Sequence, residues 1–265
     1  MNEKNQFCSR RGASSSGDGR LRSGGGGNGC GMGGNRGMGQ GSGFGGNRNM
    51  GQGGFNPAAS AMPGADFADT NRTAHRAAHV AQIRADIAAT PRGVLSAEER
   101  DDLLLMREEE KIARDVYIRM YARWGIRPFD NISGSEQAHM DAILALLEHY
   151  GERDPVQGMA IGQFHRADMQ ALYDGLIEQG LRSQTEAIRV GLLIEELDIA
   201  DLQKTARRTN KPEIRAVYAE LERGSRNHLR AFYRWKQMLG VDYAPQHLPT
   251  AEFERTGLSA HEMCA

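Results

Sequence analysis

Four stretches of the chain between residues 96 and 239 carry apolar side chains at intervals of three and four residues. This spacing places the apolar side chains on one face of an α-helix, and apolar and polar residues do not alternate there over the length of a strand. The pattern predicts an all-α fold in which amphipathic helices pack their apolar faces together. We expect four long helices, over about 96–125, 131–151, 183–206 and 210–239.

The beginnings of three of these helices carry recognisable signals. Ser96-x-x-Glu99 and Ser183-x-x-Glu186 have the capping-box pattern, in which side chains satisfy free backbone N–H groups. Pro212 suits the first turn of a helix, where its missing N–H is not needed. These signals support the predicted boundaries.

The lengths of the connections predict the topology. The connections after the first and third long helices are short, about five and three residues, but about thirty residues, 152–182, follow the second. A helix rises about 1.5 Å per residue, so the long connection can return along a whole helix, and it contains a short predicted helix over about 167–179. We therefore expect an antiparallel four-helix bundle of two hairpins joined by one long crossover, within residues 95–250.

A carboxylate, an imidazole or both interrupt the apolar face of every predicted long helix near its middle. Burying a carboxylate between apolar neighbours is costly unless another charge neutralises it. Because the interruptions fall on four helices that share one interior, we expect them to neutralise one another around a shared cation. The candidate ligands are Glu110, Glu136, His139, Glu195 with its neighbour Glu196, and His228.

The candidate ligands are of the types that bind iron or manganese, which favour carboxylate oxygen and imidazole nitrogen. Helical bundles hold two such ions with one Glu from each of two helices and a Glu-x-x-His pair from each of the other two. Glu136 and His139 form one such pair, but the residue three positions before His228 is Ser225.

Three residues could replace the carboxylate that Ser225 lacks. They are Glu222, the second glutamate of the 195/196 pair, and Asp198, which lies three residues after Glu195. A site that holds a single metal ion stays an alternative.

The motif Glu110-x-x-Ala113-x-x-x-Tyr117, followed by Glu136-x-x-His139, resembles the ligand motifs of the ferritin-like superfamily, on its rubrerythrin-related side. Four segments are similar to those of a bacterial and archaeal ferritin-like family of uncharacterised function: residues 109–117, 135–139, 194–199 and 224–232. The resemblance covers about residues 95–250 and implies a ferritin-like bundle with one long crossover.

The resemblance also implies a function and a set of ligands. It implies an oxidoreductase that acts on peroxide or oxygen through two iron ions, with manganese as the other candidate metal. Rubrerythrins carry a rubredoxin domain with four cysteines, whereas this chain has three cysteines, so we expect any electron donor to be a separate molecule. The implied iron ligands are Glu110, Glu136, His139, Glu195 or Glu196, and His228.

Other readings of the same residues stay open. The ligands would equally serve iron storage or sequestration without turnover. Alternatively, Lys111, Arg114 and Arg226 could pair with the carboxylates in a metal-free scaffold whose tail makes the functional contacts. Glu136 could also be the solvated last residue of a capping box that begins at Ser133.

The depth of the ligands along the helices constrains the first connection. Glu110 lies about 14 residues before the end of the first long helix, but Glu136 lies only about five residues after the predicted start of the second. Residues 126–130 are therefore expected to run back along the first helix as an extended segment, so that the two carboxylates align.

The flanking regions are expected to differ in character from the bundle. Of the 33 glycines, 20 precede Phe55, so residues 1–65 are predicted to be a disordered Gly/Arg/Met-rich tail. Residues 66–94 are predicted to be an Ala-rich helical linker with solvated His75 and His79, and 251–265 a C-terminal extension. Weak nucleic-acid binding by arginines of the tail stays an alternative.

The sequence also bears on localisation and assembly. No apolar run approaches the roughly 18–20 residues that a membrane-spanning helix needs. We therefore expect a cytoplasmic protein without a membrane partner, and a homodimer is an assembly that the sequence leaves open.

Overall fold

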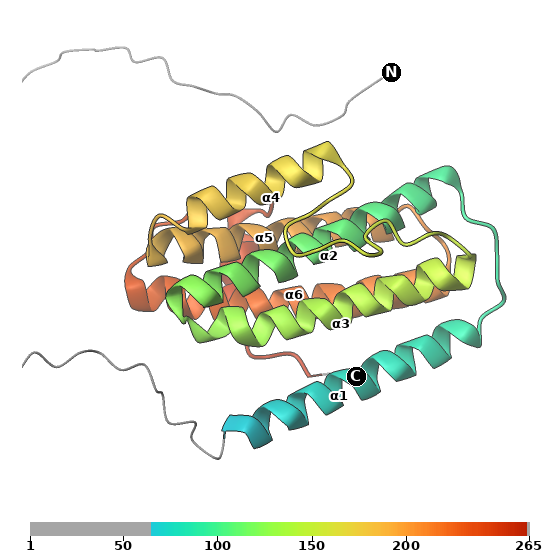
Figure 1. The fold of residues 1–265 in the computed structure, drawn as a ribbon, viewed down its shortest axis with the longest axis horizontal. Coiled ribbons are helices and arrows are strands. Elements are labelled where there is room, and N and C mark those ends of the chain that lie inside the picture. Colours follow the sequence, from blue (N-terminus) through green and yellow to red (C-terminus); the bar gives the residue numbers. More distant parts are fainter. Residues whose placement is uncertain (1–64, 264–265) are drawn as a thin grey trace, which may run out of the picture. The chain divides into compact units, whose positions relative to one another are not determined.

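The computed structural model describes residues 65–263, with side chains from Thr70 onward. This part of the chain is all-helical and holds no strand, as the periodicity predicts (Figure 1). Its helices are α1 (Ala65–Ala88), α2 (Ala97–Trp124), α3 (Arg127–Tyr150), α4 (Ala167–Gly180), α5 (Gln184–Ala206), α6 (Pro212–Leu239) and α7 (Thr250–Leu258). The predicted tail lies outside the described residues, except for its last residue, which begins α1.

The first capping signal operates as predicted. Ser96 Oγ accepts a hydrogen bond from Glu99 N at 3.1 Å, and Glu99 Oε2 accepts one from Ser96 N at 2.8 Å. At the other end of α2, Gly125 has φ +65°, a left-handed conformation that glycine adopts without a Cβ clash. Ser183 likewise accepts a hydrogen bond from Glu186 N at the start of α5.

The extended segment expected over residues 126–130 is wrong. Helix α3 begins at Arg127, four residues earlier than predicted, with Pro128 in its first turn. The proline ring holds φ near the helical value and needs no hydrogen-bond acceptor there, so it starts the helix that the apolar pattern alone did not reveal. The added turn brings Glu136 deeper into α3, and no extended return segment is needed.

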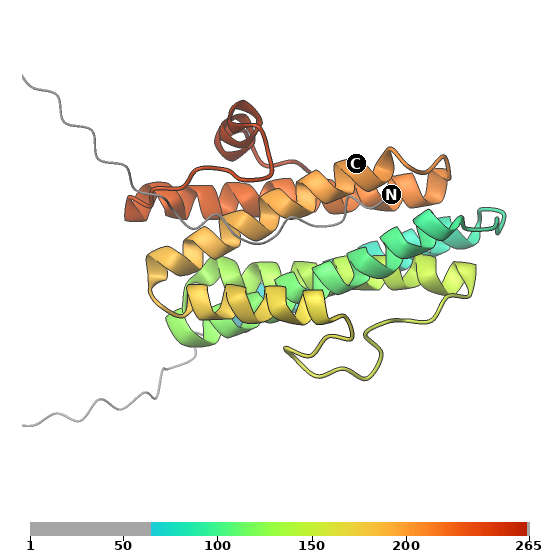
Figure 2. The ribbon, with the colours of Figure 1, turned by 90° about the horizontal axis from the view of Figure 1, so that it is seen from above.

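The four long helices α2, α3, α5 and α6 form two hairpins that pack against each other. Helix α2 contacts α3 and α5, and helix α6 contacts α5 and α3. The connection after α3 begins near the start of α2, where Arg100 Nε lies 2.7 Å from Glu152 Oε1, and then passes Arg107, whose Nη2 lies 2.9 Å from Asp154 Oδ2. It ends near the C-terminus of α2, where Trp124 Nε1 donates to Gly180 O at 2.9 Å, so α5 runs in the same direction as α3 (Figure 2).

A buried ion pair on α2 holds the long crossover in place. Lys111 Nζ lies 2.5 Å from Asp115 Oδ2 and donates to Ala160 O at 2.8 Å, while Gly162 N donates to Asp115 Oδ2 at 2.9 Å. Arg114 binds the other oxygen of Asp115. Burial lowers the pKa of Lys111, and the carboxylate of Asp115 acts against this shift. The crossover is therefore attached by charged and backbone groups that are all satisfied.

Two apolar clusters make up the core, and a layer of polar side chains lies between them. On α2, Met106 belongs to one cluster and Ile112 to the other, with Glu110 between them. On α6, Leu221 and Leu229 are divided in the same way by Ser225 and His228. The interruptions seen in the sequence are thus buried at one level of the fold.

Helix α1 and the C-terminal segment lie against the outside of the long helices. Helix α1 packs on α3 and α6, and Arg84 Nη1 lies 2.6 Å from Glu148 Oε2 of α3. Helix α7 packs on α6, and Glu262 beyond it binds Arg226 and Arg230 of α6. In residues 65–263 no helix is long and apolar enough to cross a membrane.

Asp115→Asn should lower the free energy of unfolding by about 3 kcal/mol, because it leaves the Lys111 ammonium buried beside a neutral amide. Urea unfolding followed by circular dichroism measures the change. Asp174→Asn, on the exposed face of α4, is the matched control and should change the stability by less than about 0.5 kcal/mol. Equal effects of the two substitutions would contradict the role given to the buried pair.

Glu99 links the start of α2 to the segment before α6, and this link should depend on pH. Burial acts to raise the pKa of Glu99, but hydrogen bonds from Lys211, Thr209 and Ser96 lower it to about 2. The lowered pKa means that the stabilisation is present above about pH 4.5 and is lost as the pH falls toward 2.

Glu99→Gln should therefore destabilise the protein by about 1–3 kcal/mol at pH 7, and the difference should shrink steadily below pH 4.5. Urea unfolding at pH 7, 5 and 3.5 tests this dependence. Glu98→Gln is the control, since the Glu98 side chain is 63% exposed. A difference between wild type and Glu99→Gln that stays constant with pH would exclude the proposed linkage.

Candidate metal centre

Five of the six predicted ligands meet in the polar layer between the two apolar clusters. They are Glu110 of α2, Glu136 and His139 of α3, Glu195 of α5 and His228 of α6, here called the five-residue cluster. The carboxylates of the three glutamates are fully buried, and the two imidazoles retain only about a tenth of their exposure.

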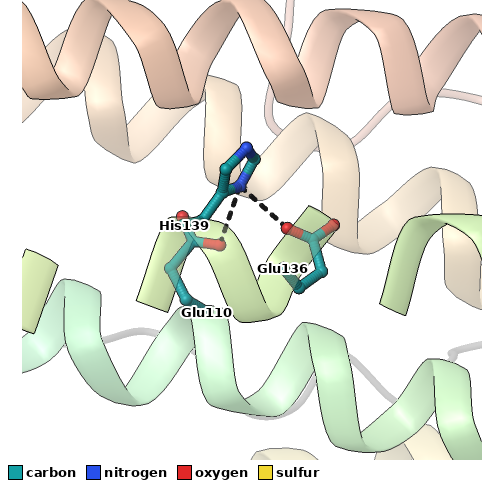
Figure 3. Close-up of side chains that lie close together, drawn as sticks. All are labelled: Glu110, Glu136 and His139. Atoms are coloured by element: carbon teal, nitrogen blue, oxygen red, sulfur yellow. Dashed lines mark hydrogen bonds and ion pairs between the residues drawn. The ribbon is translucent and has the colours of Figure 1, made fainter. Parts of the chain in front are cut away.

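One half of the cluster joins α2 to α3. His139 Nδ1 lies 2.8 Å from Glu136 Oε2 and 3.2 Å from Glu110 Oε2 (Figure 3). Each of the three side chains has a ligand atom within 4.8 Å of the others, so all three can reach one ion.

The other half of the cluster joins α3 to α5 and α6. His228 Nδ1 lies 2.9 Å from Glu136 Oε1 and 3.4 Å from Glu195 Oε2, and these three residues form the second group that could hold an ion. Glu136 is common to both groups, with one carboxylate oxygen facing each imidazole. This is the position that a carboxylate bridging two metal ions would occupy.

One buried oxygen of the cluster, Oε1 of Glu110, has no hydrogen-bond partner among the described residues. Both carboxylate oxygens of Glu136 and Oε2 of Glu195 have only the imidazole contacts given above. Buried polar atoms are almost always hydrogen-bonded, because leaving them unpaired costs the free energy of desolvation. So few partners for buried carboxylates, in two groups of side chains that could each hold an ion, are expected of ligands arranged for cations.

The cluster has strongly perturbed acid–base properties. Burial raises the pKa of Glu110 to about 7, against the effect of the neighbouring His139. Burial likewise raises the pKa of Glu195 to about 7, against the effect of His228. Burial also acts to raise the pKa of Glu136, but both imidazoles lie beside it and hold its pKa below the ordinary value. The neighbouring carboxylates raise the pKa of His139, and that of His228 to about 9, against the effect of burial.

Tyr117 orients one carboxylate of the cluster. Its hydroxyl donates to Glu195 Oε1 at 2.5 Å. Its ring packs against Phe129 and Phe232, with centroids 5.7 and 5.3 Å away. Burial and the nearby Glu195 raise the pKa of Tyr117 well above its usual range, so the hydroxyl keeps its proton and remains a donor.

Three residues could supply the carboxylate that is missing at Ser225. Of these, Asp198 is the one whose carboxylate is buried near the glutamates of the cluster. Ser225 Oγ donates to Leu221 O within its own helix at 3.1 Å. Glu222 is engaged by Arg226 and Gln203. Asp198 is buried with an unpaired Oδ2, and burial together with Glu110, Glu195 and Glu136 raises its pKa.

The sixth predicted ligand, Glu196, is not brought to the cluster. It is buried, but its carboxylate accepts hydrogen bonds from Tyr243 Oη and from the backbone N of Gln246, in the segment after α6. Adjacent residues of a helix point about 100° apart, so only one of Glu195 and Glu196 can face the common interior. The sequence alone did not identify which one.

Two local interactions considered in the sequence are not formed: the capping box at Ser133, and the pairing of Lys111, Arg114 and Arg226 with the candidate ligands. Ser133 lies inside α3 and donates to Asp130 O, and Glu136 is fully buried, so the capping box is wrong. The cations considered as partners are used elsewhere: Lys111 and Arg114 bind Asp115, and Arg226 binds Glu222 and Glu262.

A glycine that the sequence reasoning missed makes room for one imidazole. A Cβ at Gly224 would lie 2.4 Å from His139 Nε2, so α6 can pass the imidazole of His139 only without a side chain there. The rings of His139 and His228 stack with centroids 5.5 Å apart. A glycine in the middle of a helix lowers the stability by about 1 kcal/mol relative to alanine. The presence of Gly224 there was therefore the signal in the sequence for a close approach of another side chain.

Gly224→Ala should destabilise the protein by about 1–3 kcal/mol although alanine favours helix, because the methyl group collides with His139. Gly175→Ala, in α4 with no neighbour within 4 Å of the added carbon, should instead stabilise it by about 0.5–1 kcal/mol. Urea unfolding compares both variants with wild type. The double variant Gly224→Ala/His139→Ala should show a coupling free energy, and strictly additive effects would refute the contact.

Comparison with known proteins identifies relatives of this chain. The uncharacterized protein MJ0754 of Methanocaldococcus jannaschii is 45% identical over 176 residues, which cover 66% of this chain and 95% of that protein. The crystal structure of hypothetical protein MJ0754 from Methanococcus jannaschii matches with a TM-score of 0.64, covering 66% of this chain and 99% of that one.

The family match covers the helices that carry the cluster. Residues 99–260 match the uncharacterized protein domain DUF2202, a span that includes all five cluster residues and more than half of the chain. Helix α1 precedes this span. The chain therefore belongs to the DUF2202 family.

Proposed function

We propose that this chain is a ferritin-like metalloprotein that binds two iron ions, or two manganese ions, and acts as an oxidoreductase on peroxide or oxygen. The single observation that carries the proposal is the shared position of Glu136 between two groups of buried ligands. The one-crossover order of α2, α3, α5 and α6 agrees with the ferritin-like arrangement.

The electrostatic balance of the cluster supports a bound cation. Three buried glutamates contact two imidazoles, and Asp198 is buried near those glutamates, so the carboxylates outnumber the groups that can neutralise them. Lys111, Arg114 and Arg226, the cations that could have formed an ionic core, bind other carboxylates. Two divalent ions would supply the missing positive charge.

The distances within the cluster suit six-coordinate ions. Adjacent ligand atoms on an octahedral ion with bonds of about 2.1 Å are about 3 Å apart. The imidazole-to-carboxylate separations of the cluster, 2.8–3.4 Å, lie around this value. Glu110 and His139 would hold one ion, Glu195 and His228 the other, and Glu136 would bridge them, with Asp198 as a further carboxylate beside them.

Iron or manganese bound there would supply one-electron redox chemistry toward peroxide or oxygen. The protein's own contribution is to bury the three carboxylates between the two apolar clusters. Tyr117 holds one oxygen of Glu195 by its hydrogen bond and leaves the other oxygen for a metal ion. The chain has three cysteines, so we propose that electrons come from a separate donor protein.

The full-length protein should contain about two iron or manganese ions per chain when it is produced in metal-supplemented cells and purified without chelator. Glu136→Gln should lose both ions because both groups share this residue, whereas His228→Ala should lose the ion of its own group first. Elemental analysis measures the content, and circular dichroism checks that each variant is folded.

Glu222→Gln is the matched control, since Glu222 pairs with Arg226 outside the cluster, and it should keep the metal content of wild type. Peroxide consumption with an artificial reductant should follow metal content across the series. Full activity in metal-free protein, or equal metal content in Glu136→Gln and Glu222→Gln, would refute the proposal.

A further inference from the structure

A cavity of about 330 Å³ lies between α1, α3, α6 and the segment after α7. Pockets that hold small organic molecules have volumes from about 300 to about 1,000 Å³, so this cavity is larger than an oxygen or peroxide molecule needs. Its wall includes His139 and His228, whose Nδ1 atoms face the glutamates of the five-residue cluster. The two imidazoles therefore separate the cavity from the buried carboxylates.

The charged side chains that line the cavity are mostly cationic. They include Arg76 of α1 and Arg223 and Arg234 of α6, and Glu220 is the one carboxylate among the described residues of the lining. Glu220 is already engaged, because Arg223 Nη2 lies 2.7 Å and His79 Nε2 3.3 Å from its Oε2. The lining therefore favours an anion over a cation.

The register of α3 and α6 shows where these charges lie along the cavity. The two helices run antiparallel, because His139 of α3 lies against Gly224 of α6, whereas Glu136, earlier on α3, lies 2.9 Å from His228, later on α6. A step back along α3 therefore corresponds to a step of similar length forward along α6.

Arg76 and Arg234 lie at the same end of the cavity, here called the mouth. Arg76 Nη2 donates to Asn131 O of α3 at 2.7 Å. Because Asn131 precedes His139 by about two turns, the register places it about level with the exposed Arg234 of α6. Glu220 lies about 21 Å from Arg234 along α6, at a rise of about 1.5 Å per residue. The mouth is thus cationic, and the lining carboxylate lies at the opposite end.

Small neutral side chains line the wall between the mouth and the imidazoles. They include Ser135 and Ala138 of α3 and Ala231 of α6. Arg234 lies about 9 Å from His228 along α6, at the same rise per residue. A molecule held at the mouth by an anionic group can therefore place its other end beside the imidazoles and keep its charge away from the glutamates.

We propose that this cavity binds a small organic molecule with a carboxylate or phosphate group. Arg76 and Arg234 hold the anionic group at the mouth, and the body of the molecule lies against His139 and His228. Arginine suits this role because its planar guanidinium carries five N–H donors that match the oxygens of carboxylate and phosphate groups. Apolar side chains of the lining contact the body of the molecule: Val80, Ile83, Ile132 and Leu221.

Benzoate and benzamide, which have the same shape but differ in charge, test the site in an NMR titration. The full-length protein is first freed of metal with a chelator, so that the anion cannot bind a metal ion. Benzoate should bind more tightly than benzamide, and Arg234→Gln should weaken benzoate about 3–10-fold, because a charged hydrogen bond is lost. Arg215→Gln, which removes an exposed arginine of the same helix outside the cavity, should bind benzoate as wild type does.

Two further titrations sharpen the test, with circular dichroism to check that each variant is folded. Ala138→Leu should also weaken benzoate, because it fills the cavity next to His139 without changing a charge. Phenyl phosphate identifies the preferred anionic group, since either order of affinity relative to benzoate supports the site. Benzamide that binds as tightly as benzoate, Arg234→Gln that binds benzoate as wild type does, or no binding of either anion at millimolar concentration would overturn the site.

The proposed function turns this ligand class into a substrate class, and this step alone rests on it. The substrate is then an organic hydroperoxide that carries an anionic group. Its O–O bond breaks, two electrons from the separate donor and two protons are taken up, and the corresponding alcohol and water are released.

Metal-loaded protein with an artificial reductant tests the substrate class. The value of kcat/KM should be higher for cumene hydroperoxide with a carboxylate on its ring than for cumene hydroperoxide itself. Arg234→Gln should remove this preference, and Arg215→Gln should keep it. Equal kcat/KM values for the two hydroperoxides in wild type would overturn the substrate class. If neither is consumed but benzoate still binds through Arg234, the proposed function fails and the anion site stands.

Discussion

The burial of three glutamates at one level of the core is the interaction on which the rest of this structure depends. Glu110, Glu136 and Glu195 come from three helices, and their carboxylates lie between apolar side chains that offer them no neutralising charge. Such an arrangement is unfavourable unless imidazoles, protons or metal ions compensate it. His139 and His228 provide part of this compensation, and with the glutamates they form two groups of side chains that could hold a metal ion.

The remainder of the fold keeps these ligands in register. Because α3 begins with a proline-containing turn after a connection of only two residues, Glu136 lies deep enough in its helix to face Glu110. The buried Lys111–Asp115 pair attaches the crossover to α2 directly after Glu110. The crossover then leads into α5 in the direction that brings Glu195 to the same level. On α2, the ion pair that attaches the crossover is therefore formed by residues other than the one that belongs to the cluster.

The histidines of the chain connect the interior with the surface. His139 and His228 face the glutamates on one side and border a cavity on the other. The outer wall of that cavity is built by α1, which precedes the span matched by the family, and it carries two more histidines at helical spacing.

The sequence by itself determined the helices and the types of ligand. Apolar periodicity, two serine caps and the glycine after α2 specify local structure, because helix formation depends on neighbours within a few residues along the chain. The same periodicity identified Glu110, Glu136, His139 and His228 on apolar faces. Only the tertiary structure decided between Glu195 and Glu196, brought Asp198 beside the ligands, and covered the site with α1. Those outcomes depend on the rotation of each helix about its axis and on contacts between residues far apart in sequence, which no local pattern records.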